Sequence, residues 1–187
     1  SARASRPRAA RRAIRVLGRP AGGLIAASSA PRPQGVPAAP GAPAVAALEP
    51  FLARGRMKLY CPESNVAEAW TRKETPLDFR MQRHRAYERF IQETMVPFIE
   101  EDCHWPGAPI MTMGCSLGAT YAANFALKFP TTFRRALCMS GRYLATALTN
   151  GESNDDLYFN NPLVYVRNMQ GEALERVRKN THLTLVC

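Results

Sequence analysis

Apolar and polar positions after residue 44 follow two spacings, one typical of helices and one typical of short buried strands. The helical spacing predicts four helices, at 45–53, 80–101, 117–129 and 171–179. Short apolar runs predict four strands, at 57–61, 110–113, 135–139 and 182–187. Pro97 predicts a kink in the second helix. Strands that alternate with helices of this size indicate an α/β fold, with a mostly parallel sheet flanked by helices.

Residues 1–44 follow neither spacing. Five prolines and two glycines recur between positions 31 and 43. Proline lacks an N–H donor and has a fixed φ, so we expect neither a helix nor a central strand in such a stretch. The prediction for 1–44 is a disordered, basic, Pro/Ala-rich extension, and the folded domain is expected to begin at Val45.

Charge is concentrated in this extension. The 187-residue chain has a net charge of +10, but residues 1–48 hold eight arginines and no acidic residue, and the remainder has a net charge of +2. No aromatic side chain precedes Phe51 to stack on a base, so nucleic acid is not an expected partner. The chain has no apolar run of about 18 residues, so we expect no membrane span. A cytoplasmic location is predicted, or a mitochondrial one if residues 1–48 are a transit segment instead of a basic tail.

Cysteine spacing bears on metals and on redox state. The five cysteines (Cys61, Cys103, Cys115, Cys138 and Cys187) form no C-x-x-C pair and have no histidine-rich neighbourhood. An odd, scattered set fits neither a metal site nor a disulfide framework. We therefore expect no metal, no cofactor and a reducing compartment.

The segment Gly114-Cys115-Ser116-Leu117-Gly118 is the main chemical signal. It lies between the predicted strand 110–113 and the predicted helix 117–129. A serine in Gly-x-Ser-x-Gly on a sharp strand-to-helix turn is the usual nucleophile of acyl-transfer hydrolases, because the two glycines let the chain segments approach closely. Ser116 is therefore the predicted nucleophile, and the backbone N–H of Leu117 is the predicted oxyanion donor.

The chain from Val45 to Cys187 resembles the putative esterase family of α/β-hydrolases, which includes esterase D-like enzymes and mycolyltransferases. The matching segments are 57–61, 109–119, 158–162 and 181–187. The resemblance implies a partial α/β-hydrolase domain over 45–187, and hydrolysis of a small-molecule carboxylic ester by a Ser–acid–His triad. Ser116 occupies the position of the family's nucleophile.

Other parts of the family's site have no counterpart in this sequence. The resemblance implies that the acid and the histidine follow the strand at 182–187, and that a strand and loop before Val45 supply a second oxyanion donor, which residues 20–44 do not resemble. The domain is thus expected to be incomplete at both ends. The abrupt change of composition at Val45 suggests a changed reading frame or an unrelated extension.

None of the other histidines and loop aspartates is expected to act as the base or the acid of the triad. His84 is expected on a solvated helix face between two arginines, whereas His104 and His182 are expected at the wrong ends of their strands. Asp155 and Asp156 are expected to be solvated carboxylates of a loop. A serine hydroxyl without a base is a weak nucleophile, so the predicted function is a serine esterase whose turnover is impaired.

Two other functions remain open at this point. A non-catalytic pseudo-hydrolase, or a truncated fragment, would keep the sheet without the chemistry. An acyltransferase would use the same nucleophile with an alcohol acceptor in place of water. The sequence specifies neither the acyl and alcohol groups of the ester nor the oligomeric state.

Overall fold

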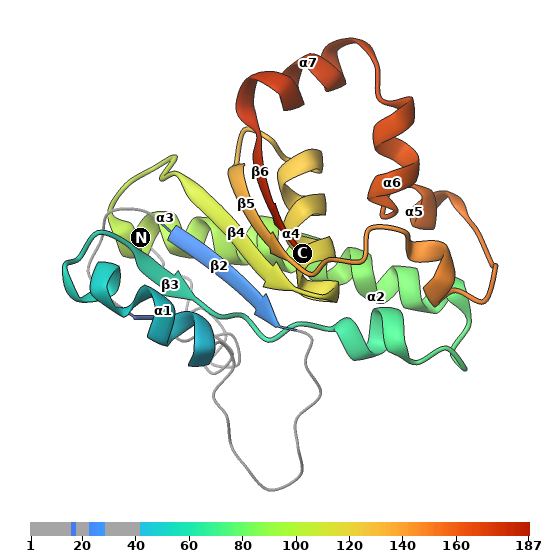
Figure 1. Ribbon diagram of the computed structural model, residues 1–187, viewed down its shortest axis with the longest axis horizontal. Coiled ribbons are helices and arrows are strands. Elements are labelled where there is room, and N and C mark those ends of the chain that lie inside the picture. Colours follow the sequence, from blue (N-terminus) through green and yellow to red (C-terminus); the bar gives the residue numbers. More distant parts are fainter. Residues whose placement is uncertain (1–15, 18–22, 29–41) are drawn as a thin grey trace, which may run out of the picture.

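The structure is a computed structural model that describes residues 16–17, 23–28 and 42–187, with side chains from Val45 onward. Its six strands form one sheet in the order β1-β3-β2-β4-β5-β6 (Figure 1). Neighbouring strands are parallel except β1 and β3. The strands are β1 (Val16–Leu17), β2 (Gly23–Ser28), β3 (Lys58–Tyr60), β4 (Ile110–Cys115), β5 (Phe133–Met139) and β6 (His182–Val186).

Helices cover both faces of this sheet, with α1 on one face and α2, α3 and α4 on the other (Figure 1). The longer helices are α1 (Ala42–Ala53), α2 (Leu77–Phe90), α3 (Val96–Cys103), α4 (Leu117–Lys128) and α7 (Gly171–Asn180). Shorter turns are η2 (Ala67–Thr71), η3 (Ile91–Met95), η4 (Ala145–Leu148), α5 (Asp155–Tyr158), α6 (Pro162–Tyr165) and η5 (Val166–Asn168). The predicted α/β class and mostly parallel sheet are confirmed.

The N-terminal region departs from the prediction. β2 lies between β3 and β4 and pairs with β4 over six residues, from Gly23 opposite Ile110 to Ser28 opposite Cys115. The expectation that residues 1–44 contain no central strand is wrong for this segment. Its physical reason is that Pro20 and the later prolines flank the strand and do not interrupt its ladder of hydrogen bonds. Residues 16–17 form β1 and residues 42–44 begin α1, whereas 1–15, 18–22 and 29–41 of the predicted disordered extension lie outside the described residues.

The helical stretch predicted at 80–101 is irregular at η3, and the irregular turn lies before Pro97 and does not include it. α2 passes through the π turn η3 into α3, and Pro97 lies in the first turn of α3. The helical turns are continuous here, since the Val96 N–H donates to Ile91 O, five residues back, and Pro97 has no N–H with which to continue that series. The predicted kink is therefore a π turn just before Pro97, a common way to relieve a helix locally.

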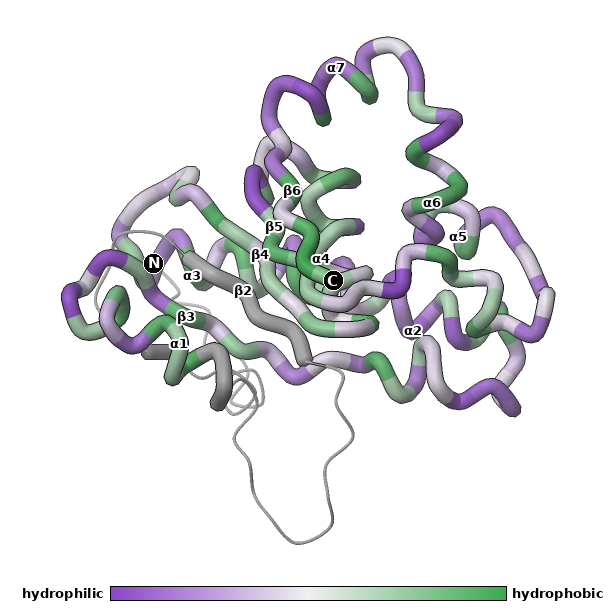
Figure 2. The backbone as a smooth tube through the Cα atoms, viewed as in Figure 1, coloured by the Kyte–Doolittle hydropathy of each residue, from purple (hydrophilic) through white to green (hydrophobic). Residues whose placement is uncertain are grey.

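The core is divided by the sheet. The larger apolar cluster lies among α2, α3, α4 and the strands beneath them, and a smaller one, around Leu52, Leu59, Cys61 and Met113, lies on the face that α1 covers. All residues of α4 from Leu117 to Leu127 are buried. α7, in contrast, is polar over most of its length (Figure 2) and has no buried residue. α4 is thus the structural centre of the domain.

A buried ion pair ties α3 to β3. Lys58 Nζ lies 2.6 Å from Asp102 Oδ2 and donates a second hydrogen bond to the backbone oxygen of Asp102, and Tyr60 OH donates to the same carboxylate. Burial by itself would raise the pKa of Asp102, but the bonds from Lys58 and Tyr60 lower it overall. The Lys58 side chain is only 8% exposed, whereas that of Asp102 is 31% exposed.

Removing the partly exposed member of this pair should destabilise the fold. We expect Asp102→Ala to lower the free energy of unfolding by about 2 kcal/mol, because it leaves a buried ammonium group without its counter-charge. The double variant Lys58→Met/Asp102→Ala should lose less, since no uncompensated charge remains. Urea unfolding of the three proteins measures this, and an equal or larger loss in the double variant would contradict the explanation.

Candidate functional site

Ser116 lies at a sharp bend between a strand and a helix. β4 ends at Cys115, α4 begins at Leu117, and Ser116 between them has φ 56° and ψ −121°. Positive φ is uncommon for a residue with a Cβ and costs about 1–3 kcal/mol, and such conformations cluster at functional sites. The strand-turn-helix context that was predicted for the motif is therefore present.

Gly114 allows the bend to close. A Cβ atom at this position would lie 2.2 Å from the backbone carbon and oxygen of Gly118, and 2.8 Å from the nitrogen of Ala119. No side-chain movement relieves such contacts, because all three atoms belong to the backbone. The first glycine of the motif is required because the end of β4 and the first turn of α4 touch each other directly.

The Ser116 hydroxyl is exposed and makes no capping hydrogen bond to α4. The backbone of Ser116 is used instead, since its N–H donates to Met139 O at 2.9 Å and its carbonyl accepts from Ala119 and Thr120. The N–H of Leu117, at the first position of α4, has no acceptor within the helix. The first turn carries no acidic side chain, so the positive end of the helix dipole is not neutralised there. This arrangement favours negative charge beside Ser116.

Carboxyl ends of several strands meet around this bend (Figure 1). Ser28, the last residue of β2, is in register with Cys115. The residues that follow it, where a second oxyanion donor would be expected, lie outside the described residues. On the other side, Ser140 follows β5 with φ 47° and donates its N–H to Val186 O at 2.7 Å. The bend thus occupies the edge where open parallel sheets place their sites.

His84 is buried, contrary to the prediction of a solvated face. It is 1% exposed and packs between the rings of Trp70 and Tyr121. Burial, with a further contribution from the charge of Lys128, lowers its pKa to about 3. Its spacing from Met81 and Tyr87, three residues on either side, matches the buried face of α2, and this was the signal that its arginine neighbours concealed.

The two other histidines lie at the predicted strand ends, whereas Asp155 and Asp156 lie in a short helix and not in the predicted loop. His104 ends α3 and His182 begins β6, and both are exposed at the edge of the sheet opposite Ser116. Asp155 and Asp156 belong to the short helix α5, and Asp156 forms an ion pair with Arg85 on the surface. None of the sequence's three histidines is placed to receive a proton from Ser116.

Two asparagines without a predicted role connect the segment after β5 to the rest of the domain. Asn160 Oδ1 accepts from Lys128 Nζ at 3.1 Å and lies 2.9 Å from His84 Nε2, while Asn160 Nδ2 donates to the backbone of Asp156. Asn161 Oδ1 accepts from the N–H of Ala145. Both side chains belong to the family-like segment 158–162; Asn160 joins it to α2 and α4, and Asn161 joins it to Ala145.

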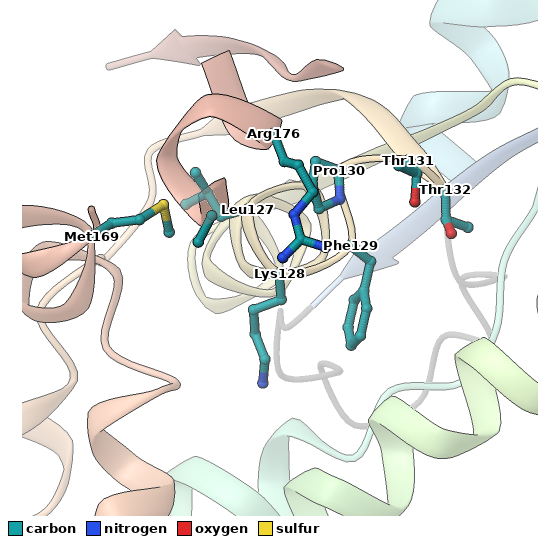
Figure 3. Close-up of a pocket in the computed structure, with 9 residues that line it drawn as sticks. Leu127, Lys128, Phe129, Pro130, Thr131, Thr132, Met169 and Arg176 are labelled. Carbon is teal, nitrogen blue, oxygen red and sulfur yellow. The ribbon is translucent and has the colours of Figure 1, made fainter. Parts of the chain in front are cut away.

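Two cavities in the described part of the chain lie away from Ser116. One, of about 190 Å³, is lined by Leu127, Phe129, Met169 and Arg176, among others, at the end of α4 (Figure 3). The second, of about 280 Å³, shares Phe129 with it. Ser116 precedes the first residue of α4, so the helix separates it from both by about 18 Å. Neither cavity is the site of chemistry at Ser116.

The described residues show no metal-ligand cluster, no disulfide and no membrane-spanning helix. They contain no group of three histidine, cysteine or acidic side chains arranged as metal ligands. The five cysteines, all within the described range, form no disulfide, and Cys61, Cys103 and Cys138 are buried. None of the helices of 42–187 combines the length and apolar composition that crossing a membrane requires.

Known structures share this fold at low sequence identity. A ferulic acid esterase is 17% identical, with a TM-score of 0.58, 86% of this chain covered and 63% of the other. An S-formylglutathione hydrolase from Staphylococcus aureus is 15% identical, with a TM-score of 0.52 and coverage of 90% and 61%. Another, from Agrobacterium tumefaciens, is 14% identical, with a TM-score of 0.59 and coverage of 92% and 79%. The chain spans less than two thirds of the first two structures, and these likenesses establish the α/β-hydrolase fold.

Sequence comparison gives the family. Among curated proteins, none matches the chain. The family model described as "Putative esterase" matches residues 63–177, which is more than half of the sequence and includes the bend at Ser116. The sheet order, the bend and this match agree, and the chain belongs to the Putative esterase family of α/β-hydrolases.

Proposed function

We propose that this protein is a serine carboxylic-ester hydrolase in which Ser116 Oγ attacks the ester carbonyl and forms an acyl-enzyme. The observation that carries the proposal is the backbone of Ser116, held at φ 56° between β4 and α4 with its hydroxyl exposed and not used as a helix cap. A strained backbone conformation of this kind persists where the surrounding contacts enforce it, and it occurs most often at functional sites. The family's esterase description supports the same chemistry.

The proposed reaction uses the start of α4. As Oγ bonds to the carbonyl carbon, the carbonyl oxygen becomes an oxyanion, and the Leu117 N–H is the proposed hydrogen-bond donor to it. The positive end of the helix dipole adds to this stabilisation. The tetrahedral intermediate then expels the alcohol, and water hydrolyses the acyl-enzyme to the acid and the original serine.

A base is the missing component of this proposal. The Ser116 hydroxyl proton must leave for attack, yet His84 is buried with a depressed pKa and His104 and His182 lie at the opposite edge. Loss of the triad histidine costs about a millionfold in kcat in a well-studied serine protease. We therefore propose that turnover by this chain alone is impaired.

A small added base should restore part of the reaction. We expect millimolar imidazole to accelerate p-nitrophenyl acetate hydrolysis by the wild-type protein at least tenfold above the rate with Ser116→Ala, because it can take the hydroxyl proton in place of a histidine. The measurement is p-nitrophenolate release, with the acetyl adduct on Ser116 located by mass spectrometry. Ser140→Ala is the matched control, since Ser140 is also exposed, also has positive φ and directly follows the next strand, β5.

The same experiment separates the alternatives. Equal rates for wild type and Ser116→Ala at every imidazole concentration would reject the esterase and favour a non-catalytic relative. A Ser116-dependent rate that rises strongly with an added alcohol, and yields the new ester, would instead identify an acyltransferase. Rapid stoichiometric labelling by an organophosphonate without imidazole would refute the proposed impairment.

A further inference from the structure

Charge around the Ser116 bend has one sign. Residues 103–151, which include β4, the bend, α4 and β5, contain no aspartate and no glutamate. The lysine and arginine side chains of this stretch are Lys128, Arg134, Arg135 and Arg142. The first three lie where α4 ends and β5 begins, at the edge of the sheet opposite Ser116. Arg142 is the member of this set that follows β5, at the edge where Ser116 lies.

Hydrogen bonds fix the backbone of Arg142 close to Ser116. Thr120 Oγ1, in the first turns of α4, donates to Arg142 O. This contact lies only about 6 Å along the helix axis from Ser116, since Thr120 follows it by four residues. The next residue of the loop is held as well, because Tyr143 O accepts from the N–H of Leu163 at 3.1 Å. Arg142 thus has a fixed place about one helical turn from the nucleophile.

The side chain of Arg142 is exposed and carries no counter-charge from the part of the chain that the structure describes. Arg83 and Arg85, in contrast, each pair with a carboxylate on the surface. A guanidinium group is always charged, and its planar N–H donors match the two oxygens of a carboxylate. The Arg142 guanidinium is therefore available to an anion that comes with the substrate.

We propose that Arg142 binds a second, ionised carboxylate of the ester, so that anionic esters are preferred over neutral esters of the same size. This inference rests on the proposed function, because attack by Ser116 fixes where the reacting carbonyl lies. With that carbonyl at the start of α4, a carboxylate on the acyl or the alcohol part accepts hydrogen bonds from the guanidinium. Arg142 selects the substrate in this way and takes no part in proton transfer.

The test measures binding to the Ser116→Ala protein, which lacks the attacking hydroxyl. Monomethyl glutarate and methyl pentanoate differ by one charge on the acyl part, whereas p-acetoxybenzoate and methyl p-acetoxybenzoate differ by one charge on the alcohol part. NMR titration at low ionic strength gives the dissociation constants. We expect the anionic member of at least one pair to bind about fivefold more tightly, as a partly exposed ion pair would give. In about 1 M salt this ratio should approach one, because the charges are screened.

Two substitutions in the same Ser116→Ala background examine Arg142 itself, with folding checked by circular dichroism. Arg142→Gln should reduce the fivefold ratio to about twofold or less, and should leave the affinity for the neutral esters unchanged. Arg142→Lys should keep part of the preference, since lysine retains the charge without the planar set of donors. Arg134→Gln is the matched control, because Arg134 is also exposed but lies at the other end of β5, and this variant should keep the full ratio.

Equal affinities within both pairs, or an unchanged ratio in Arg142→Gln, would overturn the inference. An equal loss for neutral and anionic esters in Arg142→Gln would also overturn it and make the role of Arg142 structural. A preference in one pair alone supports the inference and identifies the part of the ester that carries the carboxylate. An Arg142-dependent preference without Ser116-dependent turnover in the imidazole assay would reject the proposed function and leave an anion-binding surface. Ser116-dependent turnover without the preference would reject this inference alone.

Discussion

Gly114→Ala is expected to destabilise the protein by at least about 3 kcal/mol and to abolish chemistry at Ser116. Inserting a methyl group into a packed site usually costs about 1–3 kcal/mol. The new Cβ here would lie 2.2 Å from the backbone of Gly118, so the end of β4 and the first turn of α4 must separate. That movement displaces both Ser116 Oγ and the Leu117 N–H from their positions beside the bend.

Urea unfolding and the imidazole-dependent ester assay measure the two effects of this substitution. Gly141→Ala is the control, since a Cβ there meets the ring end of Tyr143, a side chain that can rotate away. We expect Gly141→Ala to cost less than about 1.5 kcal/mol. Stability equal to the wild type in Gly114→Ala would show that the bend is looser than the structure indicates.

The second large effect is a loss of stability in acid that depends on His84. The neutral ring is favoured in the folded protein, because protonation would place a buried charge near Lys128, and Nδ1 has no hydrogen-bond partner among the described residues. Glu88, 3.9 Å from Nε2, also faces the ring and is itself paired with Lys128. The pKa of His84 is thus lowered from 6.5 to about 3.

The sign of the pH effect follows from this lowered pKa. Below pH 6.5 the unfolded chain binds a proton at residue 84 that the folded protein does not bind until about pH 3. Stability from this group is therefore complete above pH 6.5 and decreases as the pH falls toward 3. At pH 4 the loss should reach about 3 kcal/mol, at 1.36 kcal/mol for each pH unit below the unfolded value.

His84→Gln isolates this contribution, because glutamine can still donate a hydrogen bond to Asn160 but does not titrate. Urea unfolding at pH 7.5 and at pH 4 gives the free energy of unfolding of each protein. We expect the wild type to lose about 3 kcal/mol more than His84→Gln between these two pH values. Equal losses in the two proteins would mean that His84 is accessible to protons in the folded state.

The bend at Ser116 shows which part of the site could be predicted. A strand, the Gly-x-Ser-x-Gly turn and a helix rich in small residues are all local features. The strand predicted at 110–113 spans Ile110–Cys115, and the helix predicted at 117–129 spans Leu117–Lys128. Spacing also predicted β5, β6 and α7, since the apolar period of a helix or strand is set by the geometry of the element itself. Family resemblance rested on the same local segments.

The strand β2 could not be predicted from the sequence, so the predicted sheet lacked one of its central strands. The segment Gly-Leu-Ile-Ala-Ala-Ser is short, weakly apolar and surrounded by prolines, and nothing in its own pattern distinguishes it from a loop. It becomes a strand because β3 and β4, which follow it in the chain by about 35 and 87 residues, supply hydrogen-bond partners on both sides. Pairing between such distant segments is a property of the whole fold.

The sequence by itself determined the class of the fold, the strand-to-helix bend and the serine at its centre. These features depend only on the steric limits and the apolar spacing of residues that are close together in the sequence. Only the tertiary structure decided that His84 is buried between Trp70 and Tyr121, and that Asn160 joins α2, α4 and the segment after β5. Burial and hydrogen-bond partners depend on which surfaces meet when distant segments pack. Those contacts lower the pKa of His84 and join the segment after β5 to α2 and α4.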